Sequence, residues 1–74
     1  MNYRKLMGKI VECYGVQSDC ASDLGISRAY LNQILNGKRE LSYTLMCKLV
    51  EVLHLTEREA LDIFFPNLVD KSKQ

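Results

Sequence analysis

The amino-acid sequence predicts an all-α domain of five short helices. Apolar residues recur at helical spacing in successive windows of the 74-residue chain. Glycine, serine, threonine or asparagine stands at most borders of these windows, where helices begin and end. No window shows the alternation of apolar and polar residues that is typical of strands. These three observations favour packed helices over folds that contain a sheet.

The first helix is expected over residues 3–14. Asn2 can cap its first turn, and Gly15 ends it. Side chains three or four positions apart share one face of a helix. The side chains expected to face the interior are therefore Tyr3, Leu6, Ile10, Cys13 and Tyr14.

Two further helices are predicted over residues 17–24 and 28–35. Gly25 suits the positive φ that often follows a helix end. Ser27 stands where its hydroxyl can accept from the free amides of the next helix, which ends before residues 36–37. The apolar positions of this segment are Cys20, Ala21, Leu24, Ile26, Leu31, Ile34 and Leu35.

The fourth helix is predicted to begin after Ser42, which can cap it. Leu41 and Met46 flank this cap at the spacing of a hydrophobic staple. One stripe of the helix is apolar and is expected to be buried, and it consists of Leu45, Leu49, Val52 and Leu53.

A capping box begins the fifth helix. Thr56 and Glu59 have the spacing of this motif, and Pro66 closes the helix. We expect residues 1–66 to form one domain, since a chain of this length holds one core. Residues 67–74 are interpreted as a short C-terminal tail.

The composition is that of a globular protein, with 47% hydrophobic and 26% charged residues. The net charge of +1 gives little support for binding nucleic acid. The distribution of charge is more informative, because residues 26–39 carry Arg28, Lys38 and Arg39 and no acidic residue. Contacts to phosphates need such a local positive surface.

The sequence predicts a cytoplasmic protein that does not enter a membrane. No stretch has the apolar length of a signal peptide or of a bilayer-spanning helix. The three cysteines are odd in number and contain no Cys-x-x-Cys pair, which fits reduced thiols.

Residues 17–37 resemble the helix-turn-helix of the lambda-repressor-like family, which includes phage Cro proteins and repressors. The likeness extends over residues 3–55. It implies a DNA-binding domain of five helices in which the third helix enters the major groove. The matching residues are Gln17, Ala21, Gly25, Ile26, Ser27, Leu31, Ile34, Asn36 and Gly37.

The chain departs from the family pattern at three places. Val16 replaces the usual Thr or Ser cap, which should cost about 1 kcal/mol. His54 stands where relatives often have Gly, and histidine tolerates the left-handed conformation better than most residues. Ile10 and Leu35 replace an Arg and Glu that pair in relatives, so we expect an apolar contact between them and no unpaired charge.

Four residues of the third helix are candidates for reading bases. Arg28 can donate two bonds to guanine, and Asn32 or Gln33 can pair with adenine N6 and N7. Ala29 lies between them and can meet a thymine methyl group. The alternative is that these residues form a solvated helix face.

Six residues are candidates for contacts to the DNA backbone. Gln17 lies at a helix N-terminus, where relatives use a Gln to meet a phosphate. Tyr30 either meets the backbone or packs over its own helix, and residues 38–39 clamp the backbone or form a solvated loop. The full set is Gln17, Ser27, Tyr30, Asn36, Lys38 and Arg39.

An apolar cluster near the C-terminus predicts a homodimer. Phe64 is expected to close the core, whereas Phe65, Leu68 and Val69 exceed what the core needs. No enzyme, cofactor, metal or small-molecule ligand is predicted. The single histidine and the three cysteines lack the paired spacing of a zinc site, and nothing marks a thiol as activated.

The sequence therefore predicts a transcriptional regulator that binds a double-stranded operator and acts by occupying it, as Cro-like proteins and short repressors do. Two alternatives remain open. One is an antitoxin that represses its own operon and also binds a toxin. The other is a protein-interaction module that has lost DNA binding.

Overall fold

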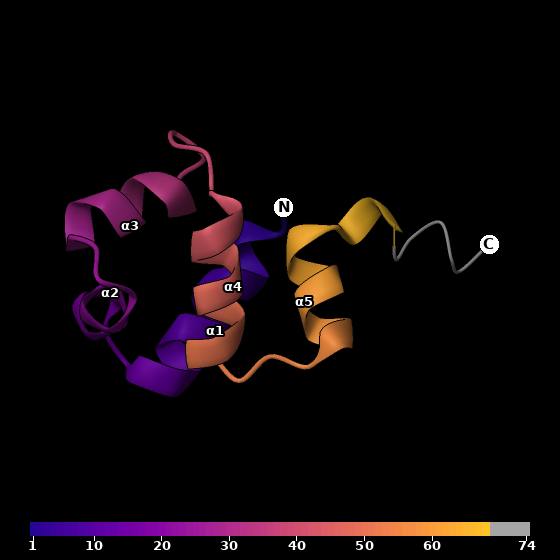
Figure 1. The fold of residues 1–74 in the computed structure, drawn as a ribbon, viewed down its shortest axis with the longest axis horizontal. Helices are drawn as coiled ribbons and strands as arrows, with labels where there is room; N and C mark the ends of the chain where they lie inside the picture. Colours follow the sequence, from indigo (N-terminus) through magenta and orange to yellow (C-terminus); the bar gives the residue numbers. More distant parts are fainter. Residues whose placement is uncertain (69–74) are drawn as a thin grey trace.

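The computed structural model describes residues 1–68 and consists of helices, without a strand in that range (Figure 1). This confirms the all-α class. A further helical turn covers residues 66–68, with Pro66 at its first position, where a missing N–H costs nothing. The five helices are α1 (Tyr3–Tyr14), α2 (Gln17–Leu24), α3 (Arg28–Leu35), α4 (Tyr43–Val52) and α5 (Glu57–Phe64).

Local side-chain caps determine where four of these helices begin. At each, a side-chain oxygen at the N-cap accepts from a backbone amide in the first turn: Asn2 for α1, Ser27 for α3, Ser42 for α4 and Thr56 for α5. Thr56 and Glu59 form the expected capping box. Val16 provides no side-chain cap for α2, so α2 depends more on packing than the other helices do.

Positive φ angles end the helices where the sequence predicted. Gly25 has φ 77°, and the amide of Ile26 donates to the carbonyl of Ala21 at 3.0 Å. His54 has φ 53°, and the amide of Leu55 donates to Val50 at 3.0 Å. Both turns are therefore Schellman closures. His54 therefore adopts the left-handed conformation after α4, at a position where glycine is common.

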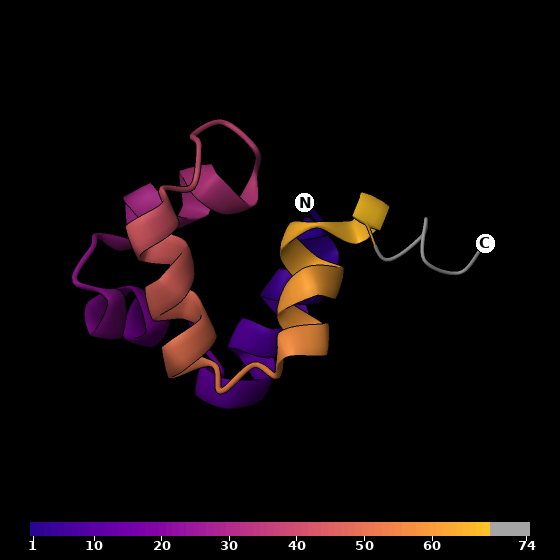
Figure 2. The same cartoon turned by 45° about the vertical axis from the view of Figure 1, so that its right-hand side comes forward.

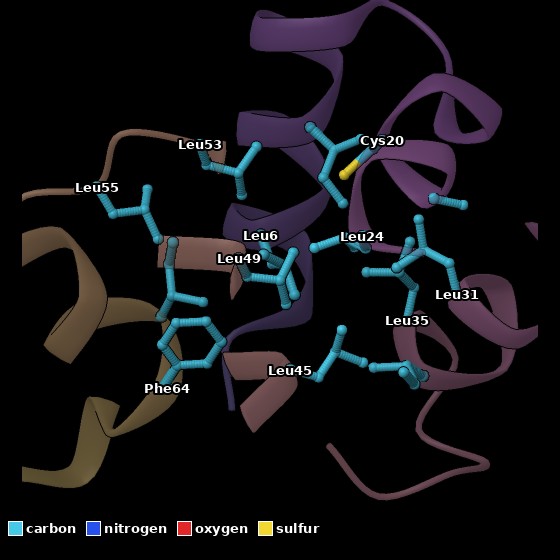
Figure 3. Packing of buried hydrophobic residues seen from close by; sticks show 14 residues of the cluster. Leu6, Cys20, Leu24, Leu31, Leu35, Leu45, Leu49, Leu53, Leu55 and Phe64 are labelled. Atoms are coloured by element: carbon cyan, nitrogen blue, oxygen red, sulfur yellow. The ribbon is translucent and has the colours of Figure 1, made fainter. Parts of the chain in front are cut away.

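One apolar core joins all five helices. Figure 3 shows side chains from each helix turned toward the same interior. Among residues 1–68 no polar or charged residue is buried. Ile10 and Leu35 both belong to this core, so no charge is left without a partner there. The buried residues are Leu6, Ile10, Cys20, Ala21, Leu24, Leu31, Ile34, Leu35, Leu45, Leu49, Leu53, Leu55, Ile63 and Phe64.

Two residues expected to face the interior do not. Tyr3 is 36% exposed, and Cys13 is also exposed. They lie one turn beyond Leu6 and Ile10, at the two ends of the buried stripe of α1. Tyr3 instead lies beside Gly37, and the Cys13 thiol approaches the carbonyl of Leu53 at 3.8 Å.

The remaining expectations about burial hold in part. Tyr14 and Ile26 are half-buried against the core, and Val52 is half-buried although it was assigned to the buried stripe of α4. Val52 is the last residue of α4, and Leu53 directly after it is buried. Leu41 and Met46 are half-buried on either side of the α4 cap, as a hydrophobic staple requires.

The last helix, α5, packs along α1 (Figure 2). The amide of Asn2 donates to the carbonyl of Ile63 at 2.6 Å. Lys5 pairs with Asp62 at 3.0 Å, and Lys9 pairs with Glu59. None of the helices within residues 1–68 has both the length and the hydropathy needed to cross a bilayer.

Candidate nucleic-acid interface

The third helix lies at the edge of the molecule, toward the end opposite α5 (Figure 1). It buries Leu31, Ile34 and Leu35 in the core and packs against α2. Helix periodicity then leaves the other face of α3 to solvent. A turn of three residues, Gly25 to Ser27, fixes its direction relative to α2.

The four residues predicted to read bases are brought together on this face. All four are exposed, and they line one shallow hollow of about 500 Å³. Two residues of the following turn complete its wall, so that the lining consists of Arg28, Ala29, Asn32, Gln33, Asn36 and Lys38. The lining of the hollow includes two cationic side chains and three amide side chains, and it includes no carboxylate.

Two hydrogen bonds hold amide side chains of this face. The Nε of Arg39 donates to the Oε1 of Gln33 at 3.0 Å. The Nδ2 of Asn36 donates to the Oδ1 of Asn32 at 2.8 Å. The guanidinium of Arg39 also lies over the ring of Tyr30, 4.7 Å from its centroid. Such stacking of a cation on an aromatic face is attractive.

Sequence reasoning placed Arg39 in a loop and missed its contacts with α3. The loop turns back because Gly37 has φ 74° and the amide of Lys38 donates to the carbonyl of Gln33 at 2.9 Å. The Asn36-Gly37 pair indicated the turn. Nothing in the sequence indicated that the side chain of Arg39 would reach back to Gln33 and Tyr30.

The residues predicted to contact phosphates have different surroundings. Lys38 and Asn36 are exposed, and Tyr30 is half-buried. The hydroxyl oxygen of Ser27 accepts from the amide of Tyr30 at 3.0 Å, which leaves its own proton free to donate.

The side chain of Gln17 is partly turned into the protein. Its Oε1 is buried and accepts no hydrogen bond from any described residue. A carbonyl oxygen and a phosphate are both acceptors, so this orientation does not compete with a phosphate contact. Donation from the Nε2 or the backbone amide of Gln17 remains the chemistry suited to that role.

The buried thiol and the phenol at α2 are not activated groups. Burial raises the pKa of the Cys20 thiol to about 11, so this thiol is protonated at neutral pH. Burial, followed by the bond that the Tyr14 hydroxyl donates to Asp23 at 2.9 Å, raises the pKa of Tyr14 to about 12. Within residues 1–68 no three His, Cys, Asp or Glu side chains gather in a group able to hold a metal ion.

An apolar surface lies on the side of the molecule away from α3. Phe65 is 47% exposed and Leu68 is 56% exposed, whereas Phe64 is buried as expected. Val69, the third residue assigned to the dimer contact, lies outside the described residues. Beside Phe65, a groove of about 220 Å³ runs between α4 and α5, with a mainly apolar lining that includes Met46, Val50 and Leu61.

Residues 1–67 match a family described as "Protein of unknown function (DUF739)". The match covers most of the chain, and the protein therefore belongs to this family. No curated protein matches the chain.

Proposed function

We propose that this protein is a sequence-specific regulator that binds double-stranded DNA through a helix-turn-helix formed by α2 and α3, of the lambda-repressor-like class. The observation that carries the proposal is the exposed face of α3. It gathers Arg28, Asn32 and Gln33 around one hollow, beside a turn that carries Lys38 and Arg39. No acidic residue occurs between positions 26 and 39, so a phosphate meets no like charge there.

The proposed mechanism places α3 in the major groove. Arg28, at the first position of α3, donates two parallel bonds to guanine, and Ala29 meets the methyl group of a thymine. Asn32 and Gln33 lie one turn further along the same face and read neighbouring base edges.

Phosphates flank this face on two sides in the proposed complex. Gln17 contacts one strand from the N-terminus of α2, where the amides carry the positive end of the helix dipole. Ser27 and Tyr30 donate from the first turn of α3. The turn after α3 contacts the other strand through Asn36, Lys38 and Arg39. These contacts set affinity and position, whereas the base contacts set sequence preference.

A second copy of the chain completes the proposed DNA-binding unit. One recognition helix covers few base pairs, and proteins of this architecture bind two half-sites about 34 Å apart. The molecule extends 39 Å along its longest axis, with α3 toward one end and the end of α5 toward the other (Figure 1). In the proposed dimer the two copies meet at Phe65 and Leu68 with their long axes inclined to each other, because an end-to-end arrangement of two 39 Å molecules would separate the α3 helices by more than about 34 Å. Val69 is assigned to the same contact from the sequence.

Occupancy is the proposed mode of regulation. A dimer that covers two half-sites blocks polymerase from the same DNA, as a Cro-like repressor does. Regulation then follows from protein concentration and from competition between operators, with no enzymatic step and no cofactor.

Titration against random duplex DNA at two salt concentrations tests the proposal. We expect measurable binding at low salt that weakens steeply as salt rises, because contacts to phosphates release counterions. Selection of bound duplexes from a random pool should then return two related half-sites. Absence of salt-sensitive binding would overturn the proposal and favour a protein-interaction module. An antitoxin would bind DNA in the same way and would bind a toxin in addition.

A further inference from the structure

Arg39 holds the side chain of Gln33 in one orientation. A guanidinium group has hydrogen-bond donors and no acceptor, so the group that meets the Nε of Arg39 must be the carbonyl oxygen of Gln33. The orientation of the Gln33 amide is therefore determined, with its oxygen toward Arg39. The NH2 group of Gln33 is the end left to face a ligand.

A backbone turn and an aromatic ring hold Arg39 in place. The backbone turn at Gly37 returns the chain over the last turn of α3, through the bond from the Lys38 amide to the Gln33 carbonyl. The guanidinium then lies over Tyr30, whose ring is half-buried against the core. Arg39 is thus anchored on one side by an aromatic ring and on the other by Gln33.

This arrangement changes what Gln33 can read. A free glutamine pairs with adenine by accepting from N6 and donating to N7. Here the oxygen of Gln33 already accepts from a cation. An adenine N6 amino group approaching the same oxygen would bring its positive hydrogens toward the guanidinium. Guanine presents two acceptors, O6 and N7, which suit the NH2 of Gln33 and the neighbouring positive charge.

The amide of Asn32 is also held through its oxygen. Its Oδ1 accepts from Asn36 at 2.8 Å, and its NH2 group remains to donate. Arg28 and Lys38, which line the same hollow, carry donors alone. Donors therefore predominate on the face of α3, where the Oδ1 of Asn36 is an acceptor that does not take part in the bond to Asn32.

We propose that Arg39 is a positioning residue that fixes the amide of Gln33 and sets a preference for guanine over adenine at the base pair that Gln33 meets. This inference rests on the proposed DNA-binding function and gives its recognition sequence a chemical class: half-sites rich in major-groove acceptors. It replaces the pairing with adenine that the residue type alone predicts for Gln33.

Selection of duplexes from a random pool, followed by titration of paired duplexes, tests the proposal. The wild-type protein should select guanine at one position of each half-site and prefer it over adenine by roughly tenfold or more. Arg39→Ala should shift the preference at that position toward adenine, because the released Gln33 can then make both bonds. Lys38→Ala is the matched control and should weaken both duplexes equally.

A double variant separates positioning from direct reading. In a Gln33→Ala background, Arg39→Ala should leave the base ratio at that position unchanged, since the side chain it positions is gone. A further shift there would mean that Arg39 reads the base itself and would overturn the proposal. The ratio of two affinities does not depend on the fraction of folded protein.

The remaining outcomes are also decisive. Two results would contradict the positioning role while leaving DNA binding intact: selection of adenine at the base pair that Gln33 meets, or an Arg39→Ala variant that keeps the wild-type preference there. A wild-type protein that binds no duplex in a salt-sensitive way would overturn both the proposed function and this inference.

Discussion

Two exposed cations near α3 have different surroundings and should have different roles. Arg28 is the first residue of α3, and Lys38 lies beyond its last turn. Both line the hollow over the exposed face. In the proposed complex, Arg28 enters the groove and Lys38 stays at its rim.

Arg28→Ala should cost about 1–3 kcal/mol on the preferred duplex and relax base choice at one position. Lys38→Ala should weaken binding to all duplexes alike and reduce the salt slope by about 1. Affinities for the preferred and a scrambled duplex at three salt concentrations measure both effects. Equal, uniform losses in the two variants would show that these roles are misassigned.

The core around Ile10 has no place for a charge. Ile10 is fully buried, and no charged side chain within residues 1–68 is buried beside it. Ile10→Arg should lower the free energy of unfolding by roughly 3 kcal/mol or more, because the guanidinium would be buried without a partner. Val11→Arg, at a neighbouring position that is 55% exposed, is the control and should melt like the wild type. A thermal melt of Ile10→Arg that matched this control would refute the prediction.

Two ion pairs join α5 to α1, in addition to the buried side chains of Ile63 and Phe64. These pairs are Lys5–Asp62 and Lys9–Glu59. The hydrogen bond from Lys9, followed by the backbone bond from Thr56, lowers the pKa of Glu59 from its ordinary value of 4.5 to about 2. Glu59 therefore favours the folded state in its charged form.

This shift predicts how stability depends on pH. The contribution of Glu59 should be complete above pH 4.5 and should be lost as the pH falls toward 2, because the folded state holds the carboxylate charged to lower pH than the unfolded chain does. Glu59→Gln keeps an acceptor for the capping box and removes the charge. Melting temperatures of the two proteins should differ at pH 6 and should approach each other as the pH falls from 4.5 through 2. A difference that stays constant across this range would contradict the assignment.

The sequence predicted the ends of the helices well, because caps and glycine turns act between residues close in the chain. Ser27 caps α3 and Gly25 ends α2, as expected. The exposure of Tyr3 and Cys13 was not predictable in this way, because burial depends on packing between elements that are distant in the chain. The contact of Arg39 with Gln33 and Tyr30 depends in turn on the path of a loop.

At the scale of the whole molecule, two surfaces face different partners in the proposed assembly. The α3 face is polar and basic, and the surface near α5 is apolar, with Tyr43 75% exposed on the α4 side of the groove. The contact at Phe65 and Leu68 is small, so a free dimer should be weak and should assemble fully on DNA.

Truncation after Phe64 should abolish self-association, because it removes the exposed apolar residues beyond α5 while leaving the buried core residues in place. Sedimentation at high protein concentration compares the truncated and full chains. Tyr43→Ser is the control and should associate like the wild type. If the truncated chain associated normally and Tyr43→Ser did not, the interface would lie on the outer face of α4 instead.

Mapping of amide chemical shifts during titration with a selected duplex tests the central claim most directly. We predict that the largest shifts fall on residues 28–39 and on the first turn of α2, with smaller changes near Phe65 as the dimer assembles. Shifts concentrated in the groove between α4 and α5, with α3 unchanged, would contradict DNA recognition by α3.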